Sequence, residues 1–408
     1  MKKRVGMKFD YEKASTREFA LKELCELWSP KREIEHVSLD EAFDRITAQD
    51  VFAQYNLPVT RSSRFDGIGV KSENFKDGVP NTSAWKRGQD FCQADTGDDF
   101  PDEFDAVVAR EQFEFNENQE PVFEDNLEPV FAGDGINPSG ATIKKGELVI
   151  PAHYRLTPEY VALCAVGGHA TLPVLKKPVV AFIPTGSELI PWGSAPKRGQ
   201  NIEANSLMVR GFVEAWGGRC ISYPVVSDDP DLLEDALDRA LEIADIIFIN
   251  GGSSRGEEDF NSEMLKRRAS HFRHGVRTVP GRPVGMSIIE NTPVINIPGP
   301  VGAAFLCCDW LLRGLLAYYL ASAVPNRPSV RAKLSHDINK KKAFERVLRV
   351  KLKKLEDESF VCTPLKASAI VENIFEADGM VAVPIGVDFV AEGEELEVLL
   401  LKPLDAIK

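Results

Sequence analysis

Three glycine-bearing segments of the chain each follow a short apolar run that has the length of a buried strand. Glycine lets the backbone approach a ligand and turn its amides inward, and the N-terminus of a following helix carries partial positive charge. Each segment alone is more typical of an ordinary turn between a strand and a helix. Three of them together indicate a site for a phosphate-bearing ligand. The segments are Thr185-Gly186 after 177–184, Gly251-Gly252-Ser253-Ser254 after 245–250, and Pro298-Gly299 after 293–297.

Acidic residues follow the same predicted strands. Mg²⁺ is typically held by a few carboxylates together with substrate phosphates, so Glu188 and Asp259 are candidate metal ligands beside the glycine segments. Asp228 and Asp229 follow a further predicted strand and directly precede Pro230. For this pair, a role in the site and a role as the N-cap of a helix are equally good interpretations.

The remaining candidate metal ligands are weaker. The seven cysteines are scattered without a C-x-x-C pair, which argues against a zinc site or a disulfide framework and favours reduced thiols. His271 and His274 lie close together in the sequence, but no third ligand accompanies them. A solvated helix end is therefore the favoured interpretation of these two histidines.

Strands and helices alternate between residues 178 and 324. The strands are apolar almost throughout, which is typical of a parallel sheet covered by helices on both faces. Ligands bind such a sheet at the carboxyl ends of its strands, where the glycine segments and the carboxylates fall. The predicted strands are 177–184, 219–226, 245–250 and 293–298, and the predicted helices are 205–216, 229–244, 262–269 and 301–324.

The flanking sequence predicts further domains. Apolar residues at helical spacing in 15–50 predict two helices, and short runs between 56 and 150, the last of them 128–133, favour strands. Alternation with period two at 344–355 and 394–401 favours strands near the C-terminus. The expected fold class is a multidomain α/β protein with a three-layer α/β/α domain and a mostly parallel sheet. Its domains would be a helical linker domain (8–55 and 151–177), an inserted β-rich domain (56–150), the α/β domain (178–328) and a C-terminal β domain (329–408).

Charge and hydropathy argue against two classes of partner. Of the net charge of −13, −12 belongs to residues 93–128, and no basic stripe is present, so binding to nucleic acid is not expected. This acidic block is either a solvated face or a docking surface for a basic partner. The apolar run 301–324 contains Asp309 and Arg313, which are expected to pair on one face of a helix. Such a pair suits a helix buried in a protein core better than a membrane-spanning helix. The basic N-terminus leads into charged sequence without an apolar stretch, so a cytoplasmic location is expected.

The order and spacing of the motifs resemble those of the molybdopterin molybdenumtransferase family, which comprises bacterial MoeA proteins and the E domain of gephyrin. The similarity covers nearly the whole chain, and the joint order of the motifs is far more specific than any one of them. The segments that carry it are SSRFDGIGV (62–70), ADTGDDFPDEFDAVVAREQ (94–112), TGSEL (185–189), NGGSSRGEED (250–259), VPGRP (279–283) and NIPGPVGAA (296–304).

The resemblance implies a homodimer with four domains per chain that inserts molybdate, or tungstate, into adenylylated molybdopterin, uses a divalent cation such as Mg²⁺ and releases AMP. It also implies possible partners, a molybdopterin adenylyltransferase and recipient molybdoenzymes. Matched motif by motif, the implied catalytic residues are Asp66, Glu188, Asp228 and Asp259, with Glu188 and Asp259 as metal ligands. The implied substrate-binding residues are Thr96, Thr185, Gly186, Asn205, Gly251, Gly252, Ser253, Ser254, Arg282, Pro298 and Gly299.

The chain departs from the family pattern at several positions. Ser187 replaces a carboxylate, Val279 and Arg282 stand where the family has lysines, and Pro300 replaces an asparagine. The segment 137–142 lacks the family's arginine and carboxylates. Two functions are therefore open: the family's enzyme, or a catalytically impaired relative that binds molybdopterin or acts as a scaffold. A nucleotide-binding α/β protein of another kind has no support, because neither G-x-x-x-x-G-K-[ST] nor G-x-G-x-x-G occurs.

Overall fold

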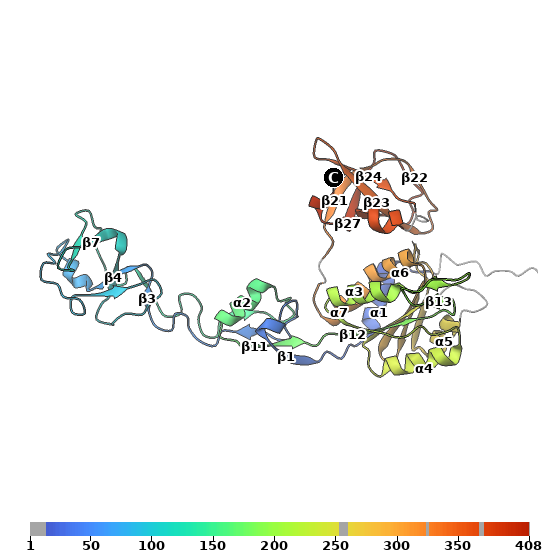
Figure 1. Cartoon of the computed structure of the whole chain (residues 1–408), viewed down its shortest axis with the longest axis horizontal. Coiled ribbons are helices and arrows are strands. Elements are labelled where there is room, and N and C mark those ends of the chain that lie inside the picture. The colour runs from blue at the N-terminus through green and yellow to red at the C-terminus, as the bar shows by residue number, and fades with distance from the viewer. Residues whose placement is uncertain (1–13, 253–259, 324–325, 367–370, 408) are drawn as a thin grey trace, which may run out of the picture. The chain divides into compact units, whose positions relative to one another are not determined.

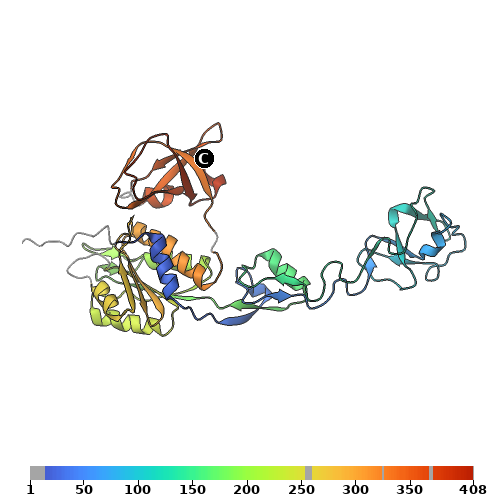
Figure 2. The same ribbon diagram turned by 180° about the vertical axis from the view of Figure 1, so that it is seen from behind.

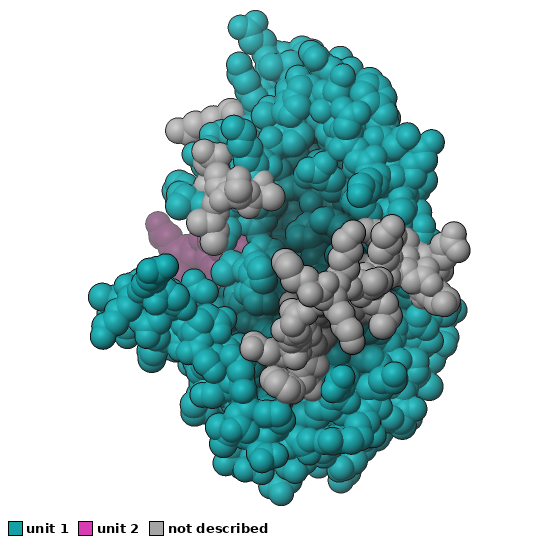
Figure 3. Space-filling model, turned by 90° about the vertical axis from the view of Figure 1, so that its right-hand side faces the viewer, with its two compact units in different colours: residues 1–33, 176–408 teal, residues 34–175 magenta. Residues whose placement is uncertain are grey.

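A computed structural model of the 408-residue chain describes residues 14–252, 260–323, 326–366 and 371–407 (Figure 1 and Figure 2). The chain forms two compact units, which Figure 3 colours separately. The first consists of residues 1–33 and 176–408, and the second of residues 34–175.

A six-stranded sheet lies at the centre of the first unit. Its strand order is β15-β12-β16-β20-β19-β17, in which neighbours among the first four are parallel and β19 and β17 are antiparallel. The predicted, mostly parallel sheet is therefore confirmed. Pro184 lies opposite Asn250, and Asn250 lies opposite Ile297, so three strands end level with one another. The strands are β12 (Val179–Pro184), β15 (Arg219–Ser222), β16 (Ile246–Asn250), β17 (His271–His274), β19 (Gly285–Ile289) and β20 (Thr292–Ile297).

Helices cover both faces of this sheet and complete the predicted three-layer domain (Figure 1). On one face, apolar residues of α4 at helical spacing, such as Leu233 and Leu237, pack against Ile247 and Ile249 of β16. The Thr16 side chain caps the start of α1 by accepting a hydrogen bond from the Phe19 amide. The helices of the first face are α4 (Pro230–Leu241) and α5 (Phe260–Arg268), and those of the other are α1 (Arg17–Leu27), α3 (Asn205–Ala215), α6 (Val301–Cys307) and α7 (Arg313–Tyr319).

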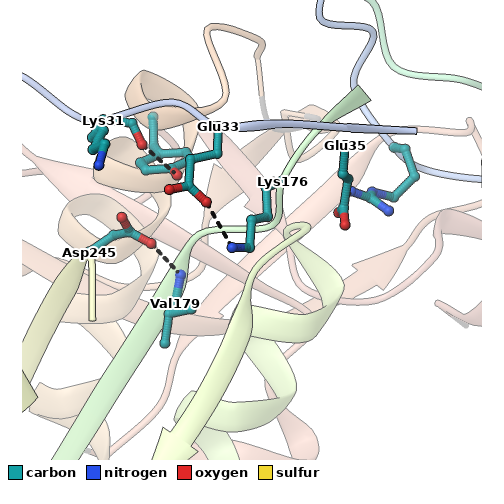
Figure 4. A network of polar contacts seen from close by, with 8 residues as sticks. Lys31, Glu33, Glu35, Lys176, Val179 and Asp245 are labelled. Carbon is teal, nitrogen blue, oxygen red and sulfur yellow. Dashed lines mark hydrogen bonds and ion pairs between the residues drawn. The ribbon is translucent and has the colours of Figure 1, made fainter. Parts of the chain in front are cut away.

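Figure 4 shows polar contacts that fix the beginnings of two central strands. The Asp245 carboxylate precedes β16 and accepts a hydrogen bond from the amide of Val179, the first residue of β12 (2.8 Å). Burial raises the pKa of Asp245, and the bond from Val179 opposes this rise. Nearby, Lys176 Nζ donates to the Glu33 carboxylate (2.8 Å), but both side chains are about half exposed, so this pair contributes little to stability.

The predicted apolar helix is present and continues from α6 through one π-helical turn (Cys308–Leu312) into α7. By length and composition, Val301–Tyr319 is long and apolar enough to cross a membrane. However, 61% of its apolar 18-residue stretch is buried inside the protein, as in a core helix. The predicted pair of Asp309 with Arg313 is wrong. Asp309 pairs instead with Arg327 (3.0 Å), which follows the helix in the sequence, and Arg313 donates to Asn326 (3.3 Å).

The C-terminal β domain forms a second six-stranded sheet in the first unit. Its order is β18-β23-β24-β21-β27-β25, and β25 also pairs with β23, so the strands close on themselves like a barrel. The strands predicted at 344–355 and 394–401 are confirmed as β23 and β27. The strands are β18 (Thr278–Val279), β21 (Ser329–Leu334), β23 (Glu345–Lys354), β24 (Phe360–Pro364), β25 (Gly379–Val383) and β27 (Glu395–Leu400), with β22 (Ile338–Asn339) and β26 (Phe389–Val390) forming a separate pair.

The second unit contains short β-strands and one α-helix, α2 (Pro158–Val166), which ends at Gly167 and Gly168. In its β-rich part, β4 (Gly67–Val70) lies between β5 (Phe91–Ala94) and β6 (Ala106–Ala109). The remaining strands form four pairs. These are β1 (Ile34–Ser38) with β11 (Thr171–Leu175), β2 (Val51–Phe52) with β10 (Leu148–Ile150), β3 (Ser62–Ser63) with β9 (Ile136–Asn137), and β7 (Phe113–Phe115) with β8 (Pro121–Phe123).

Three local predictions are wrong. The second helix predicted in 15–50 is the strand β1 followed by a short 3-10 turn (Leu39–Glu41), because this segment pairs with the distant β11. The segment 271–274 is the edge strand β17, not a helix end. The run 128–133 forms no strand.

The first helix, α1, contacts α7 and β19, so its contacts place it with the α/β domain and not with a helical linker domain. The other predicted domain boundaries stay a prediction.

Candidate functional site

The loop after β12 brings Glu188 to the carboxyl edge of the sheet. The Thr185 amide donates to the Asn250 carbonyl (2.8 Å), and the Gly186 amide donates to the Val226 carbonyl (3.0 Å). Gly186 has φ +145°, and a Cβ there would lie 2.6 Å from Glu188 Oε2. The positive φ favours glycine at 186, and the Glu188 carboxylate folds back over this residue while remaining exposed to solvent. The same loop continues into β13 (Leu189–Ile190), which pairs with β14 (Asn201–Ile202).

Asp228 is tied to this loop by a reciprocal pair of hydrogen bonds. The Ser187 amide donates to Asp228 Oδ2 (2.8 Å), and the Asp228 amide donates to Ser187 Oγ (3.0 Å). The N-cap of α4 is the neighbouring Asp229, whose carboxylate accepts from the amides of Asp231 and Leu232. The two interpretations of this aspartate pair, an N-cap role and a role in the site, thus each apply to one residue. Asp229 caps the helix, and Asp228 lies at the candidate site beside the serine that departs from the family pattern.

Buried asparagines connect the ends of β16 and β20 to the start of α3. Asn205 donates to Asn250 Oδ1 (2.8 Å) and to the Gly299 carbonyl (2.7 Å). Asn250 in turn donates to the Pro298 carbonyl (2.8 Å). Buried polar groups need such partners, and here they hold the loops in register. Asn205 was predicted from the sequence, but Asn250 was missed, although a polar residue that ends an apolar strand is a detectable signal.

The Gly251-Gly252 turn requires glycine at both positions. Their φ angles are +121° and +53°, and a Cβ on Gly251 would lie 2.4 Å from the Thr185 carbonyl oxygen. Asn261, a buried residue of α5, donates to the Gly251 carbonyl (2.9 Å) and supports the turn. Ser253, Ser254 and Asp259 lie outside the described residues. The predicted role of the turn in holding an anion stays a prediction.

Gly251→Ala is expected to lower the melting temperature and to weaken ligand binding. A side chain there adds strain of about 1–3 kcal/mol from the left-handed backbone, and it also collides with the Thr185 carbonyl. Thermal unfolding and calorimetry measure both effects. Gly211→Ala in α3 is the matched control: a Cβ there meets nothing within 4 Å, so stability should stay the same or rise. An equal melting temperature for Gly251→Ala and the wild type would contradict the expectation.

Two further predicted site residues meet in the second unit. Asp66 precedes β4, and its Oδ1 accepts hydrogen bonds from the amide (2.7 Å) and the hydroxyl (2.8 Å) of Thr96. These two bonds hold the pKa of Asp66 below its ordinary value. Asp66 is therefore an exposed, ionised carboxylate with a fixed orientation at neutral pH.

A cavity of about 620 Å³ opens where the loop 279–283 of the α/β domain meets the C-terminal β domain. Half of its lining residues are cationic, and a cluster of one sign attracts ligands of the other. Burial lowers the pKa of Lys340, whose Nζ also donates to the Phe344 carbonyl (2.8 Å). Only Arg282 among the cations was predicted. The lining consists of Val279, Gly281, Arg282, Pro283, Lys340, Lys341, Phe344 and Arg346.

The metal ligands predicted from the sequence are partly outside what the structure describes. Within the described ranges, no three His, Cys, Asp or Glu side chains form a group that could hold a metal ion. Asp259 is not among these residues, so the predicted ligand pair of Glu188 and Asp259 stays a prediction. His271 belongs to the edge strand β17, and its Nε2 atom lies 3.2 Å from the carboxylate of Glu23 in α1.

Three family models match successive parts of the chain. "MoeA N-terminal region (domain I and II)" matches residues 14–168, "Probable molybdopterin binding domain" matches residues 181–318, and "MoeA C-terminal region (domain IV)" matches residues 331–401. The three matches together span nearly the whole chain in the order expected from the motifs.

Similar proteins agree with these matches. The molybdopterin molybdenumtransferase of Bacillus subtilis is 24% identical over 94% of this chain and 93% of its own length. That of Haemophilus influenzae is 27% identical over 69% of this chain and 72% of its own. The crystal structure of the molybdopterin biosynthesis MoeA protein from Pyrococcus horikosii has a TM-score of 0.79 at 27% identity and covers 96% of this chain and 100% of that one. The chain therefore belongs to the MoeA family of molybdopterin molybdenumtransferases.

Proposed function

We propose that this protein inserts molybdate into adenylylated molybdopterin and releases AMP. The relatives from Bacillus subtilis and Haemophilus influenzae carry this transferase name. The observation that carries the proposal in this chain is the cationic cavity at the 279–283 loop. Molybdate is a divalent oxyanion, and clustered arginine and lysine side chains are the groups that bind oxyanions most strongly. Tungstate has the same charge and shape and is an alternative substrate.

Each part of the candidate site has a role in this proposal. Arg282 and Arg346 bind the oxyanion, because a guanidinium can grip two oxygens at once. The Thr185-Gly186 and Gly251-Gly252 loops form the edge of the sheet at which the pterin substrate binds. The amides of Thr185, Gly186 and Gly251 donate to backbone carbonyls, so these loops shape the site instead of donating to the phosphates. Asp228, fixed by Ser187, orients the reacting groups. Asp66, fixed by Thr96, belongs to the second unit, and its implied catalytic role stays a prediction.

Mg²⁺ fits the character of the residues at the sheet edge. The exposed Glu188 carboxylate, folded over Gly186, is an oxygen ligand of the kind that Mg²⁺ combines with substrate phosphates. Glu188 and Asp259 would hold the ion, which when bound neutralises the phosphate oxygens of the substrate.

The alternative, an impaired relative that binds molybdopterin or acts as a scaffold, rested on altered motifs. For two of these altered motifs, the structure contains groups that can compensate for the lost residues. Ser187 bonds reciprocally with Asp228, and Lys340, Lys341 and Arg346 bring cations to the loop whose lysines are missing. Since the curated relatives are named as transferases, the enzyme is the favoured function.

We further propose a cytoplasmic homodimer that receives substrate from a molybdopterin adenylyltransferase and passes product to molybdoenzymes. In this homodimer, residues 15–50 and the 178–324 domain would supply most of the contact between the two chains. The exposed apolar side chains of Phe19 and Leu27 on α1 support this proposal. Light scattering at micromolar concentration should give twice the chain mass, and a monomer would contradict the homodimer.

AMP release tests the proposed activity. Purified protein, adenylylated molybdopterin and Mg²⁺ are incubated with and without molybdate, and AMP is measured by chromatography. We expect AMP to appear at a rate that depends on molybdate. Tight binding of the pterin without any AMP would favour the scaffold function instead.

A further inference from the structure

Glu345 receives three hydrogen bonds at the junction between the C-terminal β domain and the α/β domain. Arg17 of α1 donates to both carboxylate oxygens, at 2.8 Å from Nε and 2.7 Å from Nη2. The Thr278 hydroxyl donates to one of the same oxygens (2.9 Å). The side chains of Arg17 and Glu345 are only 17% and 16% exposed. A bidentate pair shielded in this way is far stronger than a surface ion pair.

These contacts join three segments that are distant in the sequence. Thr278 lies opposite Glu345 in the parallel pair of β18 and β23, and the Glu345 amide donates to the Arg277 carbonyl (2.7 Å). The next residues along the two strands, Val279 and Arg346, line the cationic cavity. The clamp formed by Arg17, Thr278 and Glu345 therefore lies one residue from the cavity on each strand.

The cavity needs such a clamp for an electrostatic reason. Arg282 comes from one domain, whereas Lys340, Lys341 and Arg346 come from the other, and like charges brought into one cavity repel. Strand β18 has only two residues, so its backbone pairing alone gives a weak connection. Arg17 neutralises the Glu345 charge, and Glu345 in return holds the two walls at a fixed separation.

We propose that Glu345 is a positioning residue for oxyanion binding. It sets the distance between Arg282 on one wall of the cavity and Arg346 on the other, and it does not touch the substrate. This inference rests on the proposed function, because it assumes that molybdate occupies the cavity.

Glu345→Gln tests the proposal against a matched control, Glu23→Gln. Glu23 of α1 also forms a bidentate pair at similar exposure, with Arg273 of β17 (2.6 and 2.8 Å), but neither residue of this pair lines the cavity. Both substitutions should lower the melting temperature. Only Glu345→Gln should weaken molybdate binding in calorimetry, by about tenfold, since small displacements of binding groups are costly.

Two further variants separate positioning from general damage. Thr278→Val removes one hydrogen bond to Glu345 and keeps a β-branched side chain, so we expect a smaller loss of molybdate affinity. This variant tests the proposal even if Glu345→Gln folds poorly. Glu345→Asp keeps the charge and should restore part of the affinity. In turnover, Glu345→Gln should raise KM for molybdate and leave kcat within about twofold.

The outcomes distinguish the inference from the proposed function. If Glu345→Gln and Thr278→Val bind molybdate as tightly as the wild type while Arg282→Ala does not, the cavity binds molybdate and the positioning role is overturned. If Arg282→Ala also binds like the wild type, molybdate does not occupy the cavity, and the proposed site fails with it. Equal weakening by Glu23→Gln and Glu345→Gln would also overturn the positioning role.

Discussion

Arg282→Ala is expected to weaken binding of molybdate and of adenylylated molybdopterin by about one to two orders of magnitude. Arg282 is the cation that the 279–283 loop contributes to the cavity, and a charge-assisted hydrogen bond contributes roughly 1.5–3 kcal/mol. Arg282→Lys should recover only part of the affinity, because an ammonium group cannot grip two oxygens in one plane. The loss should shrink as salt rises, since the cavity opens to solvent and its charges are screened.

Calorimetry with molybdate, adenylylated molybdopterin and AMP measures this effect. Arg210→Ala is the control, because Arg210 is an exposed arginine of α3 that pairs with Glu214 and does not line the cavity. It should leave all three affinities unchanged. Wild-type affinity in Arg282→Ala would show that the cavity does not bind the anion.

Glu188→Gln is expected to lower the rate of AMP release by about two orders of magnitude or more, with a much smaller effect on pterin binding. Glutamine keeps the shape that folds over Gly186 but loses the negative charge that would hold Mg²⁺. Metal-assisted stabilisation of charge is worth several kcal/mol in a transition state. Asp259→Asn, at the other predicted ligand, should behave in the same way.

Turnover measured over a range of Mg²⁺ concentrations checks this role. Part of the loss should be recovered at high Mg²⁺, because a weakened site still fills by mass action. Glu242→Gln, at an exposed position just after α4, is the control and should behave as the wild type. Unchanged turnover of Glu188→Gln at limiting Mg²⁺ would rule out Glu188 as a metal ligand.

The sequence is informative wherever local pattern and tertiary structure agree. The apolar strands β12, β16 and β20 are buried on both faces, so their composition alone predicts a parallel sheet. Because parallel strands end at one edge, the amino-acid sequence alone is enough to place the three glycine segments together. The helical spacing in α4 is equally reliable, since its apolar residues face the core.

The sequence is misleading where pairing with a distant segment decides the structure. Residues 34–38 carry a helix-like pattern but pair with 171–175, and no local signal reports this partner. The edge strand β17 is rich in polar residues, so it lacks the apolar signature of the central strands. Asp309 pairs with Arg327 and not with Arg313 for the same kind of reason, since Arg327 lies beyond the helix.

The candidate site shows the same division. Motifs place Glu188, Asp228 and the glycine turns, whose positions follow from the ends of single strands. Lys340, Lys341 and Arg346 could not be found in this way, because they reach Arg282 only through the pairing of β18 with β23. A run of lysines in a β domain is ordinarily a solvated loop, so its contribution to a cavity depends on the junction between two domains.

The most direct test of the account is the molybdenum content of the pterin product. Protein, adenylylated molybdopterin, Mg²⁺ and molybdate are incubated, the pterin is recovered, and its molybdenum is measured by mass spectrometry beside the AMP released. The account predicts one molybdenum per pterin for each AMP, and a loss of both products in Glu188→Gln. AMP release without incorporated molybdenum, or bound pterin that never yields either product, would contradict it.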